Sequence, residues 1–265
     1  MKCKATTKNS LIFEKRYKIL VSFLSILFVL MAGSTTMLQA QMFSVGESGS
    51  RYSAPFSEVY IGLESMEATY KGAQSVNSQV RPGAFEYSGP VIKMGYNTTD
   101  LDLFLATGGK ITGVDEGAYF HTGGNLDFGI NLYRSQKLLL QIPLRLSSRY
   151  TNITNNQTIN FQSVNRFQYG MISGGVGVRG ELRPTKKIRA RFGTIPGYGF
   201  SFATGGFLGG SIGVVDAFGK LYIDRLYNNL GLSVGYKYDF RSYDVEDEVY
   251  DYDLSGHSIE IGVTF

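Results

Sequence analysis

The chain has 265 residues, of which 26 are basic and 22 acidic, and its single cysteine is Cys3. The rest of the chain therefore excludes disulfides, thiolate metal sites and cysteine nucleophiles. Glycine (33), tyrosine (18) and phenylalanine (18) are abundant and tryptophan is absent. Beyond the first forty residues no segment is apolar over the ~20 residues that a spanning helix needs. Any membrane crossing would then be made by strands.

The first predicted element is an export signal. A basic group around Lys15 precedes the apolar run 19–31, and small residues follow as far as Ala40. This order predicts a secretory signal peptide at 1–40 and one exported domain at 41–265, with a retained anchor helix as the alternative. The signal holds six of the basic residues and one of the acidic ones, so the exported part has a formal charge of −1. That charge argues against a nucleic-acid partner.

After residue 41, apolar and polar residues alternate with period two in segments of about ten residues. The clearest segment is 125–132, where the apolar residues from Leu126 to Leu132 alternate with polar residues and glycine. We predict an all-β fold, an antiparallel transmembrane β-barrel of ten strands, with eight strands as the alternative. The expected strands are 58–70, 87–97, 100–109, 118–132, 137–147, 169–183, 187–202, 207–223, 230–242 and 254–265.

Short and long connections alternate along the chain, as they do in barrels whose turns face the periplasm and whose loops face outside. The even strand count would leave both termini of the chain on the periplasmic side. The strand 207–223 is irregular, because Ile212 and Val214 lie out of phase with Val215 and Leu221, and a bulge near Val214 would explain this. The expected turns are 97–100, 133–137, 184–186 and 224–229, and the expected loops are 71–85, 110–117, 148–168, 203–206 and 243–253.

The last strand resembles the C-terminal assembly signal of bacterial outer-membrane barrels, in which a glycine and alternating apolar residues precede a terminal aromatic residue. Most of 42–265 resembles small porin-like barrels of the OmpA/OmpX type, without a peptidoglycan-binding domain. This resemblance implies an outer-membrane location, contact with lipid and lipopolysaccharide, and insertion by the barrel-assembly machinery. The residues that match the assembly signal are Gly256, Ile259, Ile261, Val263 and Phe265.

Charges of both signs fall on the polar face of the predicted strands, which would face a narrow lumen. Opposite charges should pair there, because an unpaired buried charge is costly. The alternative is a narrow charge-selective path, in which Arg189 and Arg191 beside Arg179 would form an anion-preferring constriction. The candidate lumen network is Asp127, Arg145, Arg179, Glu181, Arg189, Arg191, Lys237, Asp239, Arg241 and Glu260, and Glu64, Lys93, Asp102, Asp216 and Lys220 share its parity.

Three further motifs are weaker. The glycine pattern 175–180 fits a dinucleotide loop in sequence only, because it lies inside a strand with no helix after it. His121 should face the lumen, whereas His257 and Ser258 point to opposite faces and cannot form a catalytic pair. The acidic segment 244–253 could hold a divalent cation, but it lacks the spacing of a known calcium loop.

The sequence therefore predicts an integral outer-membrane barrel that is structural or passes small polar solutes. A loop-mediated adhesin or secretion component using 71–85 and 148–168 is a second hypothesis. A lipid-modifying enzyme centred on His121 is a third, and because no complete nucleophile, base and orienting group is visible we do not expect an enzyme. No cofactor or metal ligand set is predicted.

Overall fold

The computed structural model describes 57–71, 86–115, 117–155, 166–203, 209–227, 229–245 and 251–265, and the predicted signal peptide lies outside these residues. The described residues are almost entirely β, with one turn of 3-10 helix, η1 (Lys110–Thr112). None of their helices is long and apolar enough to cross a membrane. The strands are β1 (Ser57–Tyr70), β2 (Tyr87–Thr98), β3 (Leu101–Gly108), β4 (Gly117–Arg134), β5 (Leu138–Asn155), β6 (Arg166–Val176), β7 (Val178–Leu182), β8 (Ile188–Ala203), β9 (Gly210–Tyr227), β10 (Leu230–Val245) and β11 (Tyr252–Thr264).

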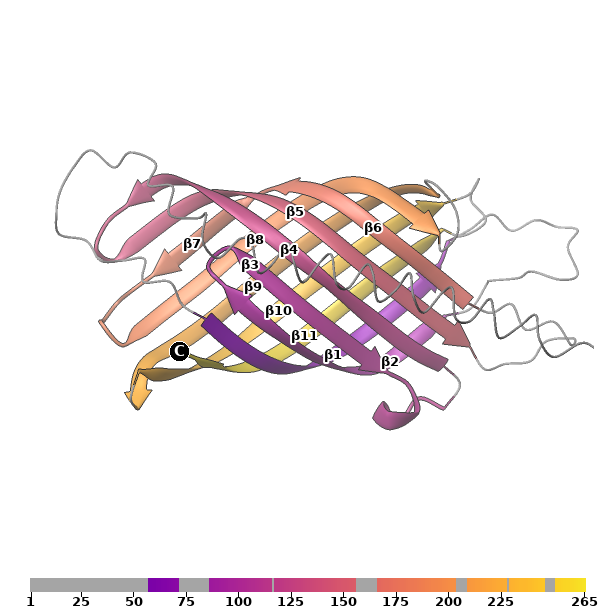
Figure 1. Cartoon of the computed structure of the whole chain (residues 1–265), viewed down its shortest axis with the longest axis horizontal. Coiled ribbons are helices and arrows are strands. Elements are labelled where there is room, and N and C mark those ends of the chain that lie inside the picture. The colour runs from indigo at the N-terminus through magenta and orange to yellow at the C-terminus, as the bar shows by residue number, and fades with distance from the viewer. Residues whose placement is uncertain are drawn as a thin grey trace, which may run out of the picture. The chain divides into compact units, whose positions relative to one another are not determined.

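The strands close into a barrel (Figure 1). Every pairing of the described strands is antiparallel, and β1 pairs with β11 from Glu58↔Thr264 to Tyr70↔Tyr252. The backbones of Ser57 and Phe265 exchange two hydrogen bonds of 3.1 and 2.9 Å at the end of this seam. Closure removes the unpaired edges that an open sheet would expose. The prediction of an all-β antiparallel barrel is confirmed.

Strands β6 and β7 act as one strand that is interrupted at Gly177, because both pair with β5 and with β8. The eleven segments therefore form a ten-stranded barrel, and the eight-stranded alternative is wrong. A Cβ atom at Gly177 would collide with the carbonyl of Thr194, and one at Gly175 would lie 2.8 Å from the carbonyl of Pro196. Close strand approach explains these glycines, and the dinucleotide-like pattern lies in β6 and β7 with no helix following it.

The alternation predicted from sequence separates the two faces of the barrel. Across the closing seam, Ile61 pairs with Ile261 and Leu63 with Ile259, and all four side chains point outward and are about 60% exposed. The inward neighbours of these residues are charged, small or aromatic and are buried. An apolar outer belt around a polar interior is the arrangement that a lipid bilayer stabilises.

Two predicted details are wrong. The fifth strand was expected to end at residue 147, but β5 continues to Asn155 and takes in the start of the expected loop 148–168. No bulge occurs at Val214, because β8 and β9 pair without a shift from Ile188↔Ile223 to Ser201↔Gly210. Ile212 and Val214 instead point into the barrel together with Asp216.

We call the end of the barrel that holds Ser57, Phe265 and the four connections 99–100, 135–137, 183–187 and 228–229 the turn end. The opposite end, where the expected loops begin, is the loop end. The C label in Figure 1 marks the turn end. The described part of the chain leaves out most of the loops 71–85 and 203–206, together with 246–250 of 243–253 and 156–165 of 148–168.

Candidate functional site

The loop-end half of the lumen is filled by apolar and aromatic side chains, which we call the apolar layer. Phe167 is at its centre, with ring centroids 4.7 Å from Tyr169, 5.1 Å from Tyr243 and 4.8 Å from Tyr252. Phe167, Tyr243 and Tyr252 are at most 1% exposed, so these rings pack against one another and their neighbours out of contact with solvent. The layer consists of Met66, Ala68, Tyr87, Val91, Ala106, Tyr119, Ile153, Phe167, Tyr169, Met171, Ile212, Val214, Tyr243, Val245, Tyr252 and Leu254.

The turn-end half of the lumen contains charges, which we call the charged layer. Arg145 binds both carboxylate oxygens of Asp127, at 2.6 and 2.7 Å, and donates to Asp216 at 2.8 Å. Arg149 donates to Asp216 and to Asp239, which lies 90 residues away in sequence. This chain of alternating charges links β4, β5, β9 and β10 across the barrel. Charge-assisted and bidentate bonds of this kind are the strong ones.

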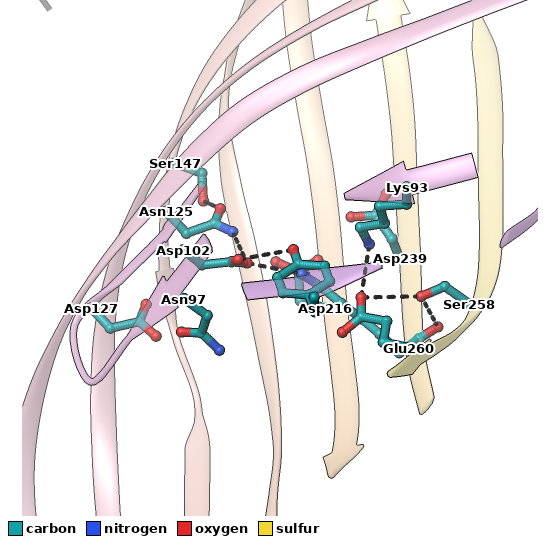
Figure 2. Close-up of polar contacts among 12 residues, drawn as sticks. Lys93, Asn97, Asp102, Asn125, Asp127, Ser147, Asp216, Asp239, Ser258 and Glu260 are labelled. Carbon is teal, nitrogen blue, oxygen red and sulfur yellow. Dashed lines mark hydrogen bonds and ion pairs between the residues drawn. The ribbon is translucent and has the colours of Figure 1, made fainter. Parts of the chain in front are cut away.

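A second group of charges lies between β1, β2, β9 and β11. Lys220 is 3.0 Å from Glu58 and 2.9 Å from Glu260. Lys93 is 3.3 Å from Glu260 and 3.6 Å from Glu64. Figure 2 shows Lys93 directed at Glu260, beside Ser258 on β11. Each lysine thus bridges two glutamates, and the buried cation and anions compensate one another.

Asp102, on β3 next to β2, accepts hydrogen bonds from several neighbours. Lys237, Tyr60 and Asn125 each donate to its carboxylate at 3.1 Å. Asn125 in turn accepts from Ser147 at 2.8 Å, and Figure 2 shows this chain of contacts. The oxygens of Asp102 are therefore already satisfied by the protein.

The predicted arginine trio lies at the turn end but does not form a single ring. Arg189 donates to Asp224 at 3.0 and 3.2 Å. Arg191 lies 3.6 Å from Glu181, and Arg179 lies 3.3 Å from Asp127. Arg189 also lies 3.9 Å from Glu181, so Arg189 and Arg191 share that carboxylate, whereas Arg179 contacts a different one. Arg189 also stacks its guanidinium 4.2 Å from the ring centroid of Tyr222.

Arg241 joins the two layers. It is fully buried and donates to Asp239 at 2.6 Å, to Thr151 at 2.8 Å and to the hydroxyl of Tyr119 at 2.9 Å. His121 lies beside it, with Nδ1 3.1 Å from Arg241 and 3.0 Å from Thr151. The His121 ring faces the lumen as expected, but it is 4% exposed and enclosed by these groups.

A cavity of about 60 Å³ remains in the charged layer near the turn end. The residues that line it come from strands all around the barrel rather than from one strand. Five cations and three carboxylates line it, so its wall carries more positive than negative side chains. The charged lining residues are Arg145, Arg179, Arg191, Lys220, Lys237, Asp102, Asp127 and Glu260.

The structure places all fifteen sequence-selected lumen charges on inward-facing strand positions. It brings the central members into direct contact, whereas Glu181 and Arg189 lie apart from them at the turn end. Sequence reasoning missed Arg149, which it assigned to a loop, and Glu58, the first residue of the expected strand 58–70. The sequence did contain a signal for Arg149. This residue has the same parity as Arg145, and only Leu146 and two serines lie between them.

The residues of the proposed assembly signal lie on both faces of β11. Ile259, Ile261 and Val263 point outward, whereas Gly256 faces the lumen, where a Cβ atom would collide with the carboxylate of Glu64. His257 and Ser258 point to opposite faces: His257 is exposed and Ser258 is buried.

The acidic segment 244–253 is described only at its two ends. There the carboxylate of Asp251 accepts from the backbone of Val245 at 2.8 Å. Among the described residues, no group of three or more His, Cys, Asp or Glu side chains is arranged to hold a metal ion.

The fold and the lumen together define a closed ten-stranded β-barrel with a filled interior. No protein-family model and no curated protein sequence matches the chain. Several solved barrels align with most of the chain at low similarity. The outer-membrane protease OmpT from Escherichia coli shares 7% identity over 84% of this chain and 99% of its own, with a TM-score of 0.42.

The toluene transporter TbuX of Ralstonia pickettii shares 8% identity over 82% of this chain and 89% of its own, with a TM-score of 0.23. A FadL homologue of Pseudomonas aeruginosa shares 9% identity over 80% and 90%, also with a TM-score of 0.23. At these identities and TM-scores, none of the three assigns an activity or a substrate to this chain.

Proposed function

We propose that the chain is an integral barrel of the bacterial outer membrane with a sealed lumen, and that it acts as a structural element of that membrane. The observation that carries this proposal is the filled interior. The apolar layer excludes water from one half of the lumen, and ion pairs occupy most of the other half. In this form the barrel is a small structural barrel comparable to the OmpA/OmpX type.

The outer surface supports the membrane location. Exposed apolar side chains occur on every strand except β3, from Ile61 on β1 to Ile261 on β11. A monomer dissolved in water rarely exposes so continuous an apolar surface. Tyrosine and phenylalanine side chains lie at the turn-end border of this belt, where membrane barrels carry aromatic girdles. Tyr133, Tyr227 and Phe265 are exposed examples.

The orientation follows from the connections. The turn end would face the periplasm, because its described connections are short, and the loop end would face outside. Export by the predicted signal peptide and insertion by the barrel-assembly machinery, with β11 recognised through its terminal residues, belong to the same proposal. Lipid and lipopolysaccharide would be its surroundings.

The sealed lumen distinguishes a structural role from a narrow porin. A solute path would need both the rings around Phe167 to separate and the Arg145–Asp127 and Arg149–Asp216 pairs to part. Breaking a buried pair leaves an uncompensated charge, which costs ~3–5 kcal/mol. Thermal opening of such a path is therefore rare.

A vesicle assay tests this proposal. The protein, refolded into lipid vesicles and checked by heat-modifiable migration on a gel, should not accelerate swelling in arabinose beyond protein-free vesicles. An open porin in parallel vesicles provides the positive control. Arabinose-dependent swelling would contradict the sealed lumen, and a helical circular-dichroism spectrum would contradict the barrel itself.

The two other hypotheses receive no such support. The loops that an adhesin or secretion component would use lie mostly outside the described residues. A lipid-modifying role for His121 would require substrate to reach a ring that Arg241, Thr151 and Tyr119 enclose. We therefore propose no enzymatic activity.

A further inference from the structure

The side chains that line the cavity at the turn end favour ligands of one charge sign over the other. Its volume of about 60 Å³ has room for a few water molecules or one small oxyanion. The apolar layer closes the lumen beyond it, so the cavity is a blind pocket rather than a segment of a channel. Access to the pocket from the periplasm rests on the proposed orientation. The affinity of the pocket for its ligand does not depend on that orientation.

The carboxylates in the wall are already neutralised by the protein. Asp127 is held by both arms of Arg145, and Asp102 accepts from Lys237, Tyr60 and Asn125. Glu260 lies 2.9 Å from Lys220 and 3.3 Å from Lys93. A cation entering the cavity would therefore find no carboxylate available to bind it.

Arg179 is neutralised much less completely. Its one carboxylate contact among the described residues is with Asp127 at 3.3 Å, and Asp127 already binds Arg145 bidentately, while Asp100 attracts it from a longer distance. The other hydrogen bonds of Arg179 go to neutral oxygens, the side-chain oxygen of Gln141 at 3.0 Å and the carbonyl of Thr99 at 3.4 Å. A guanidinium in this position, 3% exposed and lining a cavity, favours an anion that can accept its hydrogen bonds.

We propose that the cavity binds a small oxyanion, of the size of inorganic phosphate or a carboxylate group, with Arg179 as the main ligand residue. Lys237 and Lys220, which also line the cavity, add positive potential while remaining bound to their own carboxylates. The bound anion would balance the cationic excess of the wall. The barrel thereby becomes a periplasmic receptor for small anions as well as a structural element.

Calorimetric titration with inorganic phosphate tests this inference on the full-length barrel, folded in an uncharged sugar detergent that has no phosphate group of its own. The wild type should bind one phosphate per barrel. Arg179→Gln should weaken this binding at least about tenfold, since it removes a charge-assisted hydrogen bond. Arg179→Lys, which keeps the charge but loses the planar fork, should bind with intermediate affinity.

The matched control is Lys186→Gln, which removes one positive charge from an exposed position in a turn at the same end of the barrel. It should bind phosphate as the wild type does. Heat-modifiable migration establishes that each variant is folded, and if Arg179→Gln does not fold, the Arg179→Lys variant carries the comparison. Acetate in place of phosphate distinguishes a general oxyanion site from a phosphate site.

Two results would overturn the inference: no saturable phosphate binding by the folded wild type, or equal affinities for Arg179→Gln and Lys186→Gln. The second result would mean that phosphate responds only to net charge. Neither result bears on the proposal that the lumen is sealed, because phosphate binding is measured in detergent and solute passage is measured in vesicles.

Discussion

The two halves of the lumen fill the same kind of space by different chemistry. At the loop end, rings such as Phe167 and Tyr252 pack without charge, and at the turn end Arg149, Asp216 and their neighbours pack as ions. Packing of rings tolerates small adjustments, whereas an ion network tolerates the loss of a member poorly. The comparison predicts that single substitutions will be costlier in the charged layer than in the apolar layer.

The largest effect should come from Arg149→Leu. This change leaves Asp216 and Asp239 without one of their cations in a buried site, and we expect it to lower the free energy of unfolding by ~3–5 kcal/mol. Denaturant unfolding in lipid vesicles measures the loss, followed by circular dichroism because the chain lacks tryptophan. Arg183→Leu is the control, since Arg183 is 22% exposed and pairs with Glu181, and a partly exposed pair contributes ~1 kcal/mol or less. Equal losses for the two variants would remove the distinction.

A smaller effect is expected from Phe167→Leu in the apolar layer. The new side chain keeps most of the apolar volume but loses the ring contacts with Tyr169, Tyr243 and Tyr252. The free energy of unfolding should fall by ~1 kcal/mol. Ile111→Leu, at an 86% exposed site in η1, should leave it unchanged. A loss from Phe167→Leu as large as that from Arg149→Leu would show that both halves are equally intolerant.

The smallest effect concerns Asp100 in the turn between β2 and β3. Partial burial raises the pKa of this carboxyl above its ordinary value of 3.8, although Arg179 opposes the shift. A raised pKa means that the folded chain holds its proton more tightly than the unfolded chain, so ionisation of Asp100 reduces stability as the pH rises above 3.8. Asp100→Asn should therefore be slightly more stable at pH 7, by at most ~0.5 kcal/mol.

The pH dependence gives this prediction its check. The advantage of Asp100→Asn over the wild type should disappear when unfolding is measured below pH 3.8, where the carboxyl is protonated in both states. An advantage that persists in acid, or that grows there, would contradict the assigned cause.

Much of this barrel can be predicted from the alternation of apolar and polar residues in its sequence. The errors of that prediction have physical causes. Beyond the membrane the outward side of a strand is polar too, so the alternation fades along 148–155 and Arg149 was assigned to a loop. At the loop end the inward side is apolar, which put Ile212 and Val214 out of phase with the apolar residues that follow. This reversal suggested a bulge where the strand is regular.

The contacts of the site could not be predicted in the same way. Parity places Arg149 and Asp239 on the inner face, but their meeting depends on the registers of all the strands between them. The same holds for Lys220 and Glu58, which are 162 residues apart. The sequence therefore predicts which kinds of side chain face the lumen. It does not predict the partner of each charge or the sealing of the loop end, because both depend on how the barrel closes.

The sealed lumen is tested most directly by planar-bilayer conductance. We predict that the wild-type barrel gives no steady conductance. Serine substitutions at Phe167, Tyr243 and Tyr252 together remove the rings of the loop end but should give at most transient openings, because the ion pairs of the charged layer still occupy the turn end. Lys186→Gln should remain silent. Steady conductance by the folded wild type would contradict the sealed lumen.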